Sequence, residues 1–391
     1  MRSISLANNI HWVGVLNPTL RVFDVFMPTA HGTTYNAYLV KGDKTAIIDT
    51  VHEKFTEEFV ERISQHTALN KIEYLVVNHT ELDHAGSIAR FLELAPQAKV
   101  VSTRAANQFL KAILNRDFDA LIVNDGDTLD LGGKTLQFVV APFWHWPDTM
   151  FTYAAEDHVL FSCDGFGSHF CDERMFNDRV DDFWYDFKFY FDHIMRPFAD
   201  KILAGVAKVK QLELKVIAPS HGPILRSDLW RYVTAYEEWS ISAQAVERSL
   251  AVIYVSAYSN TKKLAEAIAK GAMGTGAKVK LFDATALDLA TIQDELETAR
   301  GLIFGSPTIN GDALAPVWNV INAIPLLANR GKAAATFGSY GWSGEATRLM
   351  DERLKGLKLK VTMPPFKVNF VPTAEDLAKA EAFGADFANS L

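Results

Sequence analysis

The stretch YLVVNHTELDHAGSIARFLEL, residues 74–94, decides how the first half of the chain is interpreted. It starts as an apolar run typical of a buried strand and ends in a segment whose spacing predicts a helix. Between the two, HTELDH at 79–84 places four potential metal ligands within six residues. A strand-to-helix turn can direct such side chains into one volume, because the helix N-terminus offers N–H groups that position carboxylates. A solvated polar turn that caps the helix is the alternative interpretation of this segment alone.

Three further candidate ligands stand at the ends of other apolar runs. LQFVVAPFWH ends at His145, HVLFSCD ends at Asp164, and LKVIAPSH ends at His221. Because each candidate follows a predicted strand, we expect all of them at the same rim of the fold. Any one of these residues could simply be a hydrogen-bonded loop residue. That interpretation would have to apply independently at every one of these positions, which would require several coincidences. The candidate metal ligands are His79, Glu81, Asp83, His84, His145, Asp164 and His221.

This set of side chains narrows the kind of metal site. Four imidazoles and three carboxylates are too many for one tetrahedral zinc, and they suit two five- or six-coordinate ions that share a carboxylate. Three carboxylates and one bridging hydroxide would neutralise two divalent ions. Cys163 adjoins Asp164, but neighbouring side chains of a strand point to opposite faces, so we expect this thiol in the core. The sequence therefore predicts a two-metal site with nitrogen and oxygen ligands.

From residue 251 onward, the pattern becomes strand, loop and helix in repetition, which is typical of a doubly wound parallel sheet. The segment AYSNT at 257–261 lies between the apolar run VIYVS and a predicted helix, where its polar groups can hold a phosphate. Neither G-x-G-x-x-G nor G-x-x-x-x-G-K is present there, which favours a phosphomonoester over a dinucleotide. A polar N-cap without a ligand is the alternative. The loops at 306–311 and 339–344 also follow predicted parallel strands, so we expect them at the same edge.

The motif at 79–84 resembles that of the metallo-β-lactamase superfamily, in the His-x-Glu-x-Asp-His form of flavodiiron proteins, and the three later loops resemble those of flavodoxins. The resemblance covers essentially the whole chain, in the family's domain order. It implies an α/β protein, with a metallo-β-lactamase-like αββα sandwich over residues 1–248. A flavodoxin-like doubly wound parallel sheet domain is implied over residues 249–391. The resemblance is to the form of the family without the C-terminal rubredoxin domain that some members carry.

The resemblance also assigns the metal ligands. It implies that His79, Glu81 and His145 hold one non-haem iron, that Asp83, His84 and His221 hold the other, and that Asp164 bridges them. Zinc hydrolases of the superfamily usually carry His at the third motif position, and the harder oxygen ligand Glu81 favours iron. The family varies in whether the residue at the position of His84 binds, and this stays open. Tyr190, Trp146 and Asp148 are candidates beside the irons, although aromatic runs such as FYF more often pack in a core. The segment 21–36 is expected to contribute to the pocket wall.

For the second domain, the resemblance implies FMN as the cofactor. The first loop would hold its phosphate, and the other two would flank the isoalloxazine and bond its edges. Trp342 fits equally well as a surface aromatic at a partner interface. The candidate FMN-binding residues are Ser256, Tyr258, Ser259, Asn260, Thr261, Ser306, Pro307, Thr308, Asn310, Gly311, Ser339, Tyr340, Gly341, Trp342 and Gly344.

The implied activity is that of an oxidoreductase in which FMN passes electrons to a diiron centre. That centre would reduce O2 to water, NO to N2O, or both, and so remove these gases in an anaerobe or microaerophile. FMN and a diferrous centre each store two electrons, which matches the four that O2 requires. One alternative is a dizinc metallo-β-lactamase-type hydrolase fused to a flavodoxin-like domain, which Glu81 disfavours. Another is a flavodoxin-type carrier with a docking scaffold, which leaves the candidate ligands unexplained.

Composition limits the partners. The net charge of −8 and the absence of a Lys/Arg-rich run argue against a nucleic-acid binder. No apolar run of about 20 residues and no signal segment is present, so we expect a cytoplasmic protein without membrane spans. Cys163 and Cys171 are too few for a disulfide framework or for a rubredoxin-type site of four thiolates. Electrons must therefore come from another molecule, and the resemblance implies rubredoxin or a reduced deazaflavin.

The two predicted sites lie in different domains joined by a short connection near residues 247–250. That connection gives no obvious means of bringing both sites together within one chain. The resemblance implies a head-to-tail homodimer, or a dimer of such dimers, in which the FMN of one chain approaches the diiron centre of the other.

Overall fold

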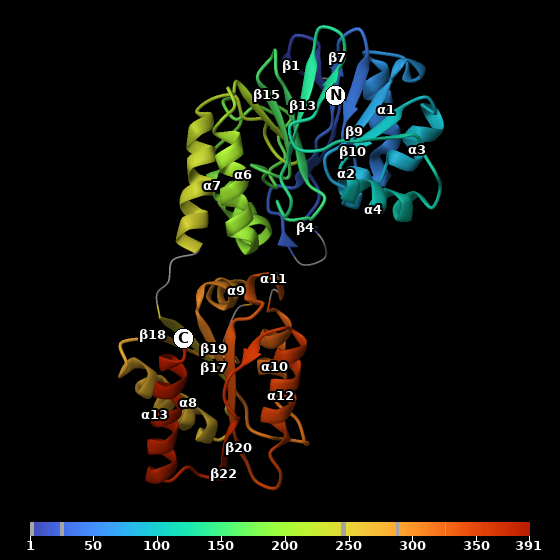
Figure 1. The fold of residues 1–391 in the computed structure, drawn as a ribbon. Helices are drawn as coiled ribbons and strands as arrows, with labels where there is room; N and C mark the ends of the chain where they lie inside the picture. Colours follow the sequence, from blue (N-terminus) through green and yellow to red (C-terminus); the bar gives the residue numbers. More distant parts are fainter. Residues whose placement is uncertain (1–3, 24–26, 244–247, 287–288, 325) are drawn as a thin grey trace. The chain divides into compact units, whose positions relative to one another are not determined.

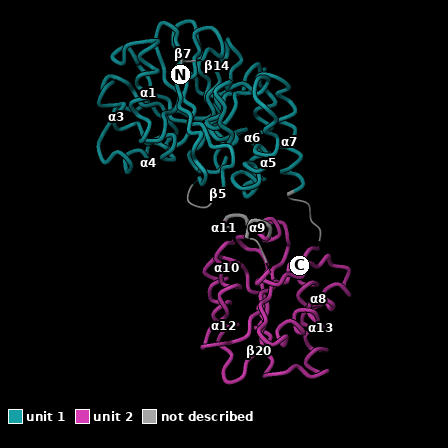
Figure 2. Tube along the Cα trace, turned by 180° about the vertical axis from the view of Figure 1, so that it is seen from behind, with its two compact units in different colours: residues 1–244 teal, residues 245–391 magenta. Residues whose placement is uncertain are grey.

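The computed structural model describes residues 4–23, 27–243, 248–286, 289–324 and 326–391. The chain separates into two compact units, residues 1–244 and 245–391 (Figure 2). The predicted domain boundary, between residues 248 and 249, immediately precedes the first strand of the second unit. No helix among the described residues is long and apolar enough to cross a membrane.

Unit 1 contains two β-sheets that pack face to face, with helices on their outer surfaces (Figure 1). The first sheet is antiparallel at one side and becomes parallel from β8 to β11. Its strands, in spatial order, are β1 (Ile4–Ala7), β2 (Ile10–Trp12), β7 (Tyr38–Lys41), β8 (Thr45–Ile48), β9 (Tyr74–Val77), β10 (Lys99–Ser102) and β11 (Ala120–Ile122).

The second sheet of unit 1 has five strands, of which only the last pair is parallel. Two short strand pairs, β3 with β6 and β4 with β5, lie outside both sheets. The strands of the second sheet are β12 (Thr128–Asp130), β13 (Thr135–Val140), β14 (Met150–Ala154), β15 (Val159–Cys163) and β16 (Val216–Pro219), and the short strands are β3 (Val15–Asn17), β4 (Val22–Phe23), β5 (Met27–Pro28) and β6 (Thr33–Tyr35).

Three apolar layers hold this sandwich together, because successive side chains of each strand face opposite sides of their sheet. In β9, Val76 faces the layer between the sheets and Leu75 faces helices α1, α3 and α4. In β13, Phe138 faces the layer between the sheets and Val139 faces helices α5, α6 and α7. The helices are α1 (Thr56–Ser64), α2 (Leu82–Ala85), α3 (Ile88–Leu94), α4 (Arg104–Leu114), α5 (Trp184–Tyr190), α6 (Ala199–Val209) and α7 (Leu229–Ala243). This arrangement is the predicted αββα sandwich.

Trp144, directly before a candidate ligand, anchors α6 to the second sheet. Its side chain is fully buried, and its indole N–H donates to the carbonyl of Lys201, 3.1 Å away. A Cβ atom at Gly205 would lie 2.1 Å from the indole nitrogen, so only glycine leaves room for this ring.

Gly205→Ala is therefore expected to lower the free energy of unfolding by about 1–3 kcal/mol, because the added methyl group overpacks the core. Urea unfolding followed by circular dichroism measures this change. Gly356→Ala is the matched control, since a Cβ at that helical glycine meets no atom within 4 Å. Equal stability of both variants would contradict the tight packing of Trp144 against α6.

Unit 2 is a parallel sheet with helices on both faces, as predicted (Figure 1). Alternate residues of β17 face opposite sides: Ile253 packs with α9, α10 and α12, and Val252 packs with α8 and α13. The strands in order are β18 (Lys278–Asp283), β17 (Ser249–Tyr254), β19 (Gly301–Gly305), β20 (Ala333–Tyr340) and then β21 (Lys360–Val361) and β22 (Phe366–Asn369), and the helices are α8 (Asn260–Met273), α9 (Leu289–Thr298), α10 (Ala315–Asn322), α11 (Leu326–Asn329), α12 (Glu345–Gly356) and α13 (Ala374–Asn389).

Candidate functional site

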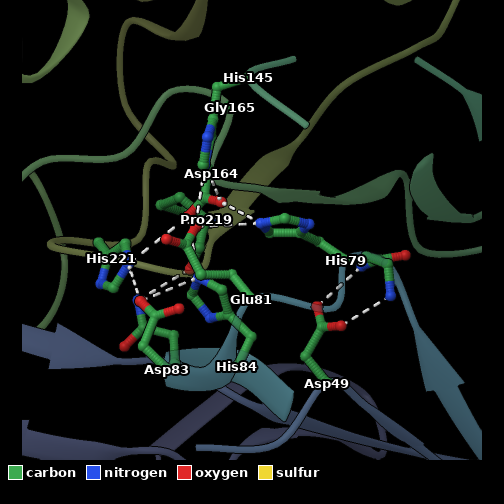
Figure 3. A network of polar contacts seen from close by, with 12 residues as sticks. Asp49, His79, Glu81, Asp83, His84, His145, Asp164, Gly165, Pro219 and His221 are labelled. Atoms are coloured by element: carbon green, nitrogen blue, oxygen red, sulfur yellow. Dashed lines mark hydrogen bonds and ion pairs between the residues drawn. The ribbon is translucent and has the colours of Figure 1, made fainter. Parts of the chain in front are cut away.

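The seven predicted metal ligands converge at one rim of the sandwich (Figure 3). The segment 79–84 follows β9 of the first sheet, whereas His145, Asp164 and His221 follow β13, β15 and β16 of the second. The site is therefore assembled from the strand ends of both sheets. Within each of two groups, the ligand atoms lie within 4.8 Å of one another; the groups are His79, Glu81, His145 and Asp164, and Asp83, His84 and His221.

Asp164 joins these two groups through its two carboxylate oxygens. Oδ2 lies 2.9 Å from Nε2 of His145 and 3.6 Å from Nε2 of His79. Oδ1 lies 2.9 Å from Nε2 of His84 and 3.5 Å from Nε2 of His221. Each oxygen thus faces a different group, which is the arrangement that a bridging carboxylate requires.

The remaining carboxylates stay within their own groups. Glu81 Oε2 lies 3.2 Å from Nε2 of His79 and 3.4 Å from Nε2 of His145. Asp83 Oδ2 lies 2.9 Å from Nε2 of His221 and 3.3 Å from Nε2 of His84. The division matches the two ligand sets that the family resemblance implies.

Burial and neighbouring charges act against each other on the pKa values of Asp83, His84 and Asp164. Burial by itself would raise the pKa of Asp164, but the charge of His84 and the hydrogen bond with His145 hold the pKa well below its usual range. Burial by itself would lower the pKa of His84, but the charges of Asp83 and Asp164 raise it to about 9. The pKa of Asp83 falls to about 2 despite its burial, chiefly because of the charge of His84. These ionised carboxylates lie against imidazoles whose protons a bound cation would replace.

Two ligand imidazoles are oriented by hydrogen bonds on the ring nitrogen that faces away from the site. Nδ1 of His79 lies 3.2 Å from Asp148, whose other oxygen accepts from the backbone N–H and hydroxyl of Thr80. Nδ1 of His221 donates to the carbonyl of Thr34, 2.6 Å away. Such bonds fix the tautomer that presents Nε2 to a metal. Nδ1 of His84 is buried without a hydrogen-bond partner, so its tautomer is not fixed in this way.

The donor set fits a pair of hard or borderline metal ions such as iron. Oδ1 of Asp83 is buried without a hydrogen-bond partner, and a cation would satisfy it. No thiolate of the described residues belongs to either group. Cys163 is buried in the core as predicted, and burial raises the pKa of its thiol well above the usual value. Oxygen and imidazole ligands without sulfur disfavour a soft-metal site.

Both aromatic candidates lie beside the ligands. Tyr190 is buried, and its hydroxyl donates to Oδ1 of Asp164, 3.1 Å away. The ring of Trp146 meets that of His79 edge to face, with 5.0 Å between centroids.

The segment expected to form the pocket wall also reaches the site, because the Thr33 hydroxyl lies 2.9 Å from Nδ1 of His169. His169 itself is a neighbour that sequence reasoning missed, and its ring lies 5.0 Å from that of His221.

In unit 2, the strand-end loops enclose a cavity of about 240 Å³. Each of the three predicted loops contributes to it, and the hydroxyls of Thr261 and Ser339 lie 2.9 Å apart where two of them meet. This cavity at the α8 N-terminus has the polar groups that a phosphate needs. Its lining residues are Ser256, Ala257, Tyr258, Asn260, Thr261, Pro307, Thr308, Ile309, Ser339, Tyr340, Gly341 and Phe370.

Some predicted FMN-binding residues lie outside this lining. Trp342 is completely exposed, and Ser306 is buried with its hydroxyl donating to the carbonyl of Pro307. Conversely, Phe370 lines the cavity but was not predicted, and it directly follows the short strand FKVN. The predicted residues outside the lining are Ser259, Ser306, Asn310, Gly311, Trp342 and Gly344.

Comparisons with known proteins agree with both units. Family models match residues 33–222 as an ODP family beta lactamase and residues 252–384 as a flavodoxin. The chain is 42% identical to the flavo-diiron protein FprA2 of Clostridium acetobutylicum, over 100% of both chains. It is 38% identical to the nitric oxide reductase of Moorella thermoacetica, over 98% of each. The structure of rubredoxin oxygen:oxidoreductase from Desulfovibrio gigas is similar with a TM-score of 0.78 and 30% identity, covering 100% of this chain and 98% of that one. The Clostridium relative covers both units at well above 30% identity, and the chain belongs to the flavodiiron protein family.

Proposed function

We propose that this oxidoreductase transfers electrons from FMN, bound within residues 249–391, to two non-haem irons bound within residues 1–248. The reaction is the reduction of O2 to water, of NO to N2O, or of both, and it removes these gases. The observation that carries the proposal is the contact of Asp164 with two separate ligand groups. The names of the Moorella and Desulfovibrio relatives agree with these two substrates.

The proposed assignment of ligands follows the distances within the site. His79, Glu81 and His145 would hold one iron, Asp83, His84 and His221 the other, and Asp164 would bind both. When bound, the ferrous pair and reduced FMN supply the electrons for gas reduction.

The surrounding side chains orient the ligands and control protons. Asp148 holds His79 with Nε2 toward the metals. The Tyr190 hydroxyl is a buried proton donor that is not a ligand, and it donates to Oδ1 of Asp164, where we propose that it holds a proton beside the reacting gas. Burial raises the pKa of Tyr190 well above its usual value, so this hydroxyl keeps its proton.

For FMN, we propose that the phosphate lies at the α8 N-terminus beside Ser256, Asn260 and Thr261. Residues from the loops at 306–311 and 339–344 would then flank the isoalloxazine. The electron donor is proposed to be an external rubredoxin or a reduced deazaflavin, because Cys163 and Cys171 cannot form a four-thiolate site. We further propose the head-to-tail homodimer, alone or as a dimer of dimers.

Cofactor content tests this function most directly. The purified protein is expected to contain about two irons and one FMN per chain, because two ligand groups and one phosphate pocket are present. Metal analysis and flavin absorbance measure both, and gas electrodes measure O2 and NO consumption by the anaerobically reduced protein. Zinc alone, with no redox turnover after iron reconstitution, would refute the diiron centre and favour the dizinc hydrolase. FMN without tightly bound iron would favour the electron carrier.

A further inference from the structure

Phe370 follows β22, the edge strand of unit 2, and lines the cofactor cavity beside the three predicted loops. Its side chain is 59% exposed and so leaves aromatic surface open beside the cavity. Its φ of 52° lies in the left-handed region, which bulky side chains rarely adopt. Backbone strain of this kind concentrates where a ligand is held.

The loop at 339–344 is fixed by the end of β22. The backbone N–H of Phe370 donates to the carbonyl of Tyr340 at 2.7 Å, and the amide of Asn369 donates to the carbonyl of Gly341 at 3.3 Å. A Cβ at Gly341 would lie 3.0 Å from the Phe370 ring, so the ring covers the backbone of this glycine. Phe370 and the loop therefore form one packed wall of the cavity.

The two ends of the cavity differ in polarity. Hydroxyl and amide groups of Ser256, Asn260 and Thr261 lie at the α8 N-terminus, whereas Pro307, Ile309 and Phe370 provide apolar surface. A phosphorylated molecule with a large aromatic ring system matches this division, since aromatic rings stack on apolar walls and phosphates bind helix N-termini.

We propose that Phe370 binds FMN directly, as an aromatic wall against the isoalloxazine, and positions the loop at 339–344 around that ring. The exposed phenyl ring then becomes covered when the flavin binds. This inference rests on the proposed binding of FMN in unit 2 and adds a contact from a fourth strand end to the three predicted loops.

The test compares FMN with riboflavin, which has the same ring system but no phosphate. Flavin is removed from the full-length protein, and fluorescence titration measures the affinity of each ligand. Phe370→Ala is expected to weaken the binding of both ligands by the same factor, about tenfold, because it removes a contact with the ring. Thr261→Val is expected to weaken FMN binding alone. Phe370→Tyr keeps a flat ring and should bind both ligands as the unaltered protein does.

Val371→Ala is the matched control, because Val371 is 61% exposed but does not line the cavity. Its affinity for both ligands should be unchanged. The absorption bands of bound FMN give a second readout, and they should shift in Phe370→Ala but not in Val371→Ala. Unchanged affinity and spectrum in Phe370→Ala would overturn the inference, as would weaker binding of FMN alone. Failure of the unaltered protein to bind FMN would instead refute the proposed function on which the inference rests.

Discussion

Asp164→Ala is expected to remove most of the bound iron and to lower gas reduction by at least about a hundredfold. The carboxylate of Asp164 is buried and contacts ligand imidazoles of both groups, so its loss affects both metal positions at once. Two cations would then share the charge of two carboxylates instead of three, in a site with little solvent to compensate. Iron analysis and gas electrodes measure the two losses.

FMN content should stay near that of the unaltered protein, because the flavin cavity is lined only by residues of unit 2. Asp164→Asn keeps the volume of the side chain but removes its negative charge. The iron content of this variant should still fall, because a neutral amide is a poor bridging ligand. Asp200→Ala is the surface control, since Asp200 is 62% exposed and its ion pair with Lys201 lies at the surface. Near-normal iron and turnover in Asp164→Ala would show that Asp164 is not the bridge.

Mixing two inactive variants is expected to restore activity if FMN of one chain serves the metals of its partner. One parent carries Asp164→Ala and lacks the diiron centre. The other carries Ser256→Ala and Thr261→Val, which remove hydroxyls at the phosphate end of the flavin cavity. After dissociation and random reassembly, about half of the dimers are mixed, and each has one competent pair out of two. Activity should therefore return to about a quarter of that of the unaltered protein.

The parents give the baseline when each is dissociated and reassembled alone, because no competent pair can form there. Different affinity tags on the two parents allow the mixed dimers to be isolated and counted. Isolated mixed dimers without activity would mean that electrons pass within one chain, and the head-to-tail arrangement would be wrong. A protein that stays monomeric would refute the proposed dimer directly.

Much of the metal centre could be predicted because its ligands obey a local rule. His145, Asp164 and His221 each end an apolar run, and strand ends of a layered fold meet at a rim. Their supporting contacts follow no such rule. The carbonyl of Thr34 accepts from His221 across 187 positions of sequence, and nothing in either segment alone indicates that they meet.

For the flavin site, the sequence predicted too many residues. Most residues of each loop were predicted to bind FMN, but only some of them line the cavity. Ser306 turns its hydroxyl to the carbonyl of Pro307 and to the backbone N–H of Leu314, and Trp342 points into solvent. Phe370 was missed because β22 is an edge strand with only one apolar side chain buried, so its sequence gives a weak signal. Applying the strand-end rule to that fourth strand would have found it.

The two sites also differ in how freely their sequences can change over evolution. The seven metal ligands follow strands of two different sheets. A small displacement of one sheet relative to the other would therefore separate the ligands of that sheet from the rest. Substitutions that alter the spacing of either sheet must therefore be compensated in the other. The flavin cavity is built at the strand ends of a single sheet, so changes in its loops need no matching change in a second sheet. Descendants of this chain should accordingly exchange flavin specificity more readily than metal chemistry.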